Sequence, residues 1–189
     1  MKLPFNHHKK IKLYGVVCTF YVLNIFKVKK ESLDLDEILK LDLLHEKFLH
    51  EQDYAAIVPK ETSFLPRINE TTFKDYDYYG SLLKSNIKIS DFEDLNYLDY
   101  LDRIENMFKN WEANDEDDLL LKQIRAFHHR SLKDLEDFNL KSRRFYLLEA
   151  PLTDYTDDHS FHWTYGRFIT VISVDPYSQN LFIINFGND

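Results

Sequence analysis

Apolar residues recur about every 3.6 positions in three stretches, which is the spacing of one buried helix face. The stretches span about residues 34–52, 90–111 and 114–138. The second opens on Ser90-Asp91-Phe92-Glu93, the residue types of a capping box. Because a short connection separates the last two stretches, we expect two to three long amphipathic helices that include an antiparallel helical hairpin. The apolar face expected for the second helix comprises Phe92, Leu95, Leu98, Leu101, Ile104, Phe108 and Trp111.

Strand-like patterns occupy both ends of the chain. Residues 144–149 and 166–174 have strand composition, and residues 181–186 return as a partner after the turn-forming residues 175–180. The run 13–26 is also rich in β-branched and aromatic side chains. We therefore predict an α+β fold with one or more N-terminal strands, the helices, and a C-terminal antiparallel sheet of about three strands. A length of 189 residues indicates a single domain over residues 1–189.

The apolar run 13–26 has a second interpretation, because seven lysines and no acid lie within the first thirty residues. Lysines around an apolar run are also typical of an export signal or a membrane anchor. Fourteen residues fall short of the roughly 20 that span a bilayer as a helix, and no small-residue cleavage site follows. We prefer a buried strand or strand pair and keep a membrane tether at residues 13–26 as the alternative.

The rest of the chain is strongly acidic. The 159 residues after the first thirty carry all 32 acids against 17 bases. Such a body repels nucleic acid and attracts basic partners. The single cysteine, Cys18, excludes a disulfide within the chain and favours a reducing, cytoplasmic location.

The sequence holds no complete catalytic or cofactor signature. It lacks a Gly-Lys-Ser/Thr phosphate loop and a Gly-x-Ser-x-Gly nucleophile elbow. The residues Asp158, His159 and His162 have the ligand types of a metal site, but residues three apart in an extended strand point to opposite faces. A metal-dependent hydrolase at these residues is therefore an alternative function. Our preferred interpretation has no metal, no cofactor and no catalytic residue.

Acidic residues gather on the second and third predicted helices, with tyrosines among and near them. Tyrosine is favoured in interface cores, and a charged field speeds association with an oppositely charged partner. The alternative is an ordinary solvated acidic surface. We expect the partner-binding residues to be Asp99, Asp102, Asp115, Glu116, Asp117, Asp118, Tyr97, Tyr100 and Tyr155.

In small size, acidity and lack of catalytic motifs the chain resembles bacterial immunity proteins, a likeness of general character that no motif carries. The resemblance implies a cytoplasmic, non-enzymatic protein that neutralises a basic protein partner such as a toxin domain. On this interpretation the chain binds neither nucleic acid nor a membrane. The identity of the partner and the oligomeric state stay open.

Overall fold

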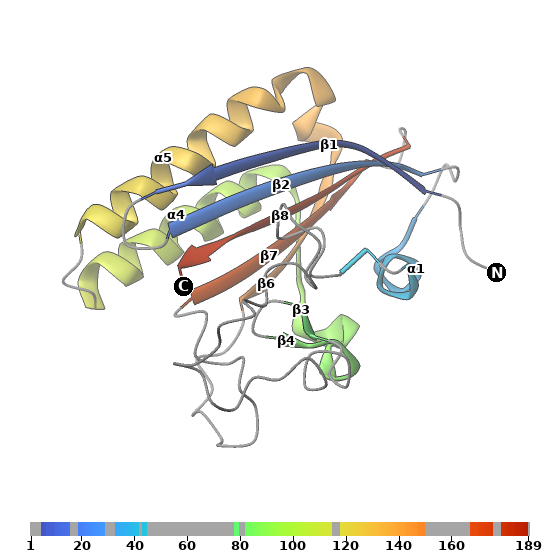
Figure 1. The fold of residues 1–189 in the computed structure, drawn as a ribbon, viewed down its shortest axis with the longest axis horizontal. Coiled ribbons are helices and arrows are strands. Elements are labelled where there is room, and N and C mark those ends of the chain that lie inside the picture. Colours follow the sequence, from blue (N-terminus) through green and yellow to red (C-terminus); the bar gives the residue numbers. More distant parts are fainter. Residues whose placement is uncertain are drawn as a thin grey trace, which may run out of the picture.

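The computed structural model describes residues 5–15, 19–28, 33–41, 43–44, 78–79, 82–114, 118–149, 167–175 and 179–188. Their central feature is a six-stranded antiparallel sheet in the order β1-β2-β8-β7-β6-β5 (Figure 1). Its strands are β1 (Phe5–Tyr14), β2 (Thr19–Val28), β5 (Glu93–Leu95), β6 (Arg144–Glu149), β7 (Arg167–Val174) and β8 (Asn180–Asn188).

Two helices, α4 (Tyr97–Asn114) and α5 (Asp118–Asp134), lie side by side on one face of this sheet (Figure 1). On the other face, the short helix α1 (Leu35–Lys40) and Tyr79 of strand β3 (Tyr78–Tyr79) contribute to the core, and β3 pairs with the short strand β4 (Leu82–Leu83). The described residues also form the short 3-10 helices η2 (Lys84–Asn86), η3 (Ile89–Asp91), η4 (Glu136–Phe138) and η5 (Leu140–Ser142). The predicted α+β class is confirmed.

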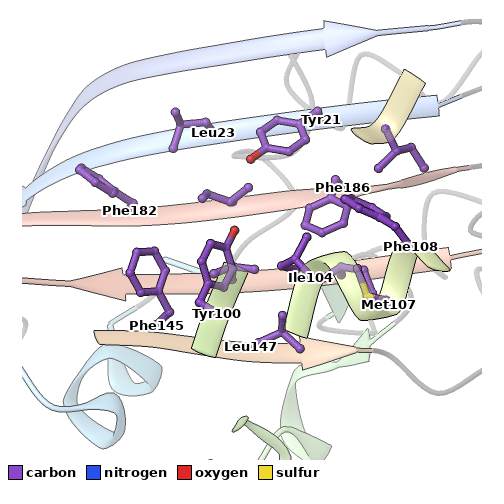
Figure 2. Packing of buried hydrophobic residues seen from close by; sticks show 14 of the residues in the cluster. Tyr21, Leu23, Tyr100, Ile104, Met107, Phe108, Phe145, Leu147, Phe182 and Phe186 are labelled. Atoms are coloured by element: carbon purple, nitrogen blue, oxygen red, sulfur yellow. The ribbon is translucent and has the colours of Figure 1, made fainter. Parts of the chain in front are cut away.

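The central strands are buried on both faces, so that the sheet separates two hydrophobic cores. In β2, Tyr21 and Leu23 pack beneath α4 and α5 (Figure 2), whereas Val22 and Phe26 face the α1 side. Strands covered on both faces show continuous apolar runs rather than alternation. This double burial explains the uninterrupted hydrophobicity near the N-terminus.

The N-terminal run forms strands, as the preferred interpretation predicted. β2 pairs with β1 on one side and with β8 on the other. The described residues of the run 13–26 are therefore strand and not helix, apart from Gly15 between the two strands. Within the described ranges, no helix is long and apolar enough to span a membrane.

The sheet is larger than the three C-terminal strands that the sequence predicted. Strands β6, β7 and β8 follow the expected pairing, and β1, β2 and β5 extend the sheet on both sides. Strand β8 pairs with β7 on one edge and with β2 on the other, so the N-terminal strands continue the predicted C-terminal sheet.

The second helix begins later than predicted. Glu93–Leu95 pairs with β6 as strand β5, and Asn96 caps α4 by accepting hydrogen bonds from the backbone N–H groups of Leu98 and Asp99 at 2.9 and 3.0 Å. The expected capping box at Ser90 is not used, because Ser90 lies within the 3-10 helix η3. Leu98, which we had expected on the apolar face, is 68 % exposed.

The first helix is shorter in the described residues than the predicted 34–52. Asp34 caps it, since its carboxylate accepts from the Glu37 backbone N–H at 2.8 Å, and Glu37 reaches back to the Asp34 N–H. Leu41 is already extended and ends the helix. The part of the prediction from residue 45 to residue 52 lies outside the described residues.

Candidate functional site: an acidic helix beside a basic one

The first turns of α4 present acidic and apolar side chains together. Asp99 and Asp102 are exposed, and neither forms an ion pair with another described residue. Asp99 accepts from the Asn96 side chain and lies in the first turn, where the helix dipole favours a negative charge. Leu98, in the same first turn of α4, is mostly exposed. The start of α4 therefore presents an apolar side chain and two carboxylates on one exposed surface.

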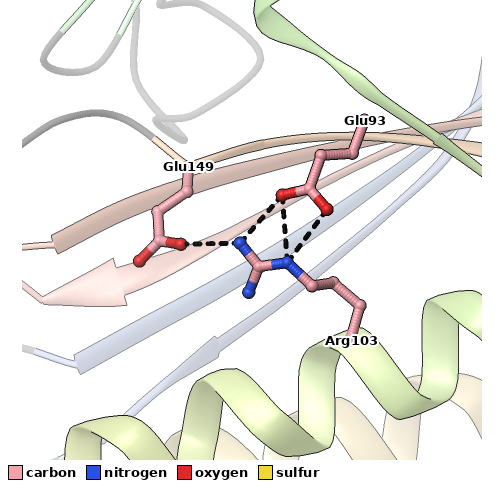
Figure 3. Close-up of polar contacts among 3 residues, drawn as sticks. All are labelled: Glu93, Arg103 and Glu149. Atoms are coloured by element: carbon pink, nitrogen blue, oxygen red, sulfur yellow. Dashed lines mark hydrogen bonds and ion pairs between the residues drawn. The ribbon is translucent and has the colours of Figure 1, made fainter.

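The acids on the neighbouring strands are compensated. Arg103 of α4 donates to Glu93 of β5 at 2.8 and 3.0 Å and to Glu149 of β6 at 3.1 Å (Figure 3). These carboxylates raise the pKa of Arg103, chiefly through the hydrogen bond to Glu93. Arg144 holds Asp94 in the same way, with its Nη2 2.7 Å from the carboxylate. Each of these three carboxylates therefore has an arginine partner, whereas Asp99 and Asp102 of α4 have no ion-pair partner among the described residues.

α4 and α5 meet at Arg125. Its guanidinium lies 3.3 Å from the Glu105 carboxylate and 2.6 Å from that of Glu112, and it also lies 5.4 Å from the centre of the Phe108 ring. Two further acids of α4 are thus compensated by α5. Exposed ion pairs contribute only about 0.2–1 kcal/mol each, so their main effect is to orient the two helices.

The structure separates positive from negative charge. Residues 89–114, which include β5 and α4, carry seven acids and two bases, whereas α5 carries four bases and two acids. Strand β1 carries three lysines and no acid. Because α4 contacts β5 and β6 while α5 contacts β2 and β8, the acidic and basic elements cover different halves of the sheet. The acids predicted for the start of the third helix, residues 115–118, are not among the side chains that the structure describes, so an acidic surface shared by both helices stays a prediction.

The predicted partner-binding residues have different fates. Asp99 and Asp102 lie on the surface, and Tyr97 is half-buried with its ring centre 5.9 Å from that of Phe145. Tyr100 is a correction: it is completely buried and stacks on Phe145 at 4.3 Å, so it cannot contact a partner in this structure. Asp118 begins α5, but its side chain is not described. Asp115, Glu116, Asp117 and Tyr155 lie outside the described residues.

The alternative metal site also falls where the structure gives no description, since Asp158, His159 and His162 all lie outside the described ranges. Among the described residues, no group of three or more His, Cys, Asp or Glu side chains is placed to hold a metal ion.

Sequence reasoning did not find a buried polar cluster beneath the helices. His128 of α5 lies with its Nδ1 3.3 Å from the Tyr21 hydroxyl, and the rings of Tyr100, Phe108 and Phe186 surround it. Burial lowers the pKa of His128 from 6.5 to about 3, so the imidazole is neutral at neutral pH. Since His128 is only 2 % exposed, this cluster belongs to the core and is closed to a substrate.

A helical-phase signal could have identified His128. Ile124 and His128 are four residues apart on one face and are both buried, whereas His129 is exposed. No local signal identifies Tyr21 as its partner, because the two residues are 107 positions apart.

Comparisons of the chain with protein-family models, curated proteins and solved structures gave no match. The functional argument therefore depends on the geometry and charge of the molecule.

Proposed function

We propose that this chain is a non-enzymatic binding protein that neutralises a basic protein partner through the first turns of α4. The observation that supports the proposal is that Leu98, Asp99 and Asp102 all lie within the first two turns of α4. All three are exposed, while Arg103 and Arg144 hold the acids of the adjoining strands. In many interfaces a buried apolar centre supplies most of the affinity, and a polar rim around it fixes the orientation of the partner.

In this proposal the acidic side chains affect the association rate and the apolar side chain affects the dissociation rate. Asp99 and Asp102 attract a positively charged surface from beyond contact distance and raise the association rate. Leu98 enters an apolar pocket of the partner and slows dissociation. Such a complex inhibits a toxin or another basic protein by covering its positively charged functional surface, in the manner of an immunity protein.

The test uses the tagged full-length chain to capture partners from its native cells, followed by kinetics with the purified partner. We expect the double charge reversal Asp99→Lys/Asp102→Lys to lower the association rate at least tenfold at low ionic strength and to weaken its salt dependence. Leu98→Ala should raise the dissociation rate and change the association rate little.

The matched control is Asp134→Lys/Asp137→Lys, which makes the same change in net charge at exposed positions at the end of α5 and in η4. If the control lowers the association rate as much as the α4 variant does, the net charge of the protein, and not the α4 surface, sets the association rate. Association that is unchanged in the α4 variant would reject α4 as the binding surface.

A further inference from the structure

A second surface of the molecule lies at the opposite edge of the sheet. Strand β1 is the last strand on this side, and only β2 pairs with it among the described strands. Its ten residues extend about 34 Å at the usual rise of an antiparallel strand. The outer edge of such a strand presents backbone N–H and C=O groups that can pair with another chain.

This edge is basic on a chain that is acidic as a whole. Lys9, Lys10 and Lys12 lie in β1. Helix α5 lies over this half of the sheet, because its Gln123 accepts a hydrogen bond from Thr19 of β2 at 2.9 Å. The exposed side of α5 adds further positive charge from Lys122, Arg130 and Lys133.

The charge of the edge selects among possible occupants. Antiparallel pairing of β1 with β1 of a second copy brings two lysine-rich strands together, and like charges on facing strands are destabilising. Edge lysines are a common protection against such self-association. The same lysines favour a strand that carries acids, because opposite charges at cross-strand positions stabilise pairing.

The register of β1 limits where the pairing can occur. The pairing with β2 shifts between His7 and Lys9, and it is continuous from Lys9 to Tyr14. A bulge bends its strand and interrupts a ladder, so the regular part of the edge is the segment 9–14. We propose that residues 9–14 accept an extended acidic peptide segment of a partner protein as a seventh strand of the sheet.

The experiment uses three synthetic peptides of eight residues on the full-length protein. One alternates glutamate with threonine and valine, the second replaces each glutamate by lysine, and the third is the glutamate peptide methylated at alternate backbone nitrogens. Methylation keeps the charge and removes the donors of the added strand. Binding is followed by fluorescence anisotropy and by amide hydrogen exchange measured residue by residue.

We expect the glutamate peptide to slow exchange at alternate amides of residues 9–14 at least tenfold and to bind more weakly as salt increases. The methylated peptide should bind at least tenfold more weakly. The variant Lys9→Glu/Lys10→Glu/Lys12→Glu should reverse the preference in favour of the lysine peptide. If that variant does not fold, Lys9→Gln/Lys10→Gln/Lys12→Gln should abolish the preference.

The control variant is Asp99→Lys/Asp102→Lys, which changes the α4 surface and should leave peptide binding unchanged, so that failure of this inference and failure of the proposed function are distinguishable. If the methylated peptide binds as tightly as the glutamate peptide, the inference is overturned. Charge alone would then account for binding, and the same surface would bind any polyanion, including nucleic acid. Protection of residues 9–14 that rises with protein concentration alone would make a second copy the occupant. An edge that no peptide protects would mean that the lysines only guard it.

Discussion

The guanidinium of Arg143 lies over the ring of Phe182 in the core, 3.8 Å from the ring centre. It donates to the Ser173 hydroxyl at 2.9 Å and to the backbone oxygens of Ser173 and Asn180 at 2.9 and 2.7 Å. Burial lowers the pKa of Arg143 to about 10, and the nearby Asp175 carboxylate partly opposes that shift. Arg143 therefore joins the start of β6 to the end of β7 and the start of β8, and it remains charged at neutral pH.

Replacing Arg143 should destabilise the fold more than replacing its neighbour. We expect Arg143→Ala to cost about 3–5 kcal/mol, because it breaks a buried charged network and leaves the two carbonyls without their donor. Arg144→Ala removes an exposed ion pair with Asp94 and should cost less than about 1 kcal/mol. Urea unfolding of both variants measures the difference, and similar losses would contradict the clamping role of Arg143.

The buried His128 should make stability depend on pH. Its folded pKa is about 3 and its unfolded pKa is about 6.5, so the unfolded chain binds a proton that the folded chain excludes. The folded state therefore loses stability as the pH falls from about 6.5 towards 3, by up to about 1.4 kcal/mol per pH unit. The titratable rings next to His128 are those of Tyr21, Tyr100 and His129, and burial raises the pKa of both tyrosines, so they stay neutral in this window.

The measurement compares urea unfolding of the wild type, His128→Phe and His129→Phe between pH 5 and 7. His128→Phe should flatten the dependence, whereas His129→Phe should retain it. If His128→Phe shows the same change of unfolding free energy with pH as the wild type, groups other than His128 cause the pH dependence.

Local patterns were sufficient for strands β6, β7 and β8 and insufficient for strand β5 and the start of α4. Two capping signals lie six residues apart, at Ser90 and Asn96, and both satisfy local rules. The choice between them depends on the pairing of Glu93–Leu95 with β6, about fifty positions away in the chain. The strand 144–149 was predicted correctly because its composition alone is decisive.

The candidate surface was only partly predictable for a similar reason. The exposure of Asp99 and Asp102 follows from helical phase. The pairing of Arg103 with Glu149 does not, because it joins residues 46 positions apart. The burial of Tyr100 had a local signal, since Tyr100, Ile104 and Trp111 share one face at helical spacing. The predicted apolar face included the exposed Leu98, and this shifted the predicted buried face of the helix away from Tyr100.

The phase of α4 can be tested by placing one acid on each of its faces. Ile104 is buried beneath the helix, so Ile104→Asp should bury an unpaired charge and unfold the protein. Phe108→Asp should do the same for the same reason. Leu98→Asp on the exposed face should change stability by only about 0.5 kcal/mol. Circular dichroism and thermal unfolding measure all three, and a folded Ile104→Asp protein would refute the packing of α4 on the sheet.

The close approach of β7 and β8 should make Gly187 intolerant of a side chain. A Cβ at residue 187 would lie 1.8 Å from the backbone oxygen of Arg167, and a backbone atom cannot move without shifting the strand. A Cβ at Gly15 would instead lie nearest to side-chain atoms, those of the Gln123 amide and the Thr19 hydroxyl. We expect Gly187→Ala to cost about 1–3 kcal/mol, as overpacking in a core does, and Gly15→Ala to cost less. Urea unfolding of the two variants checks the order, and a greater loss in Gly15→Ala would mean that the two strands separate more easily than their packing indicates.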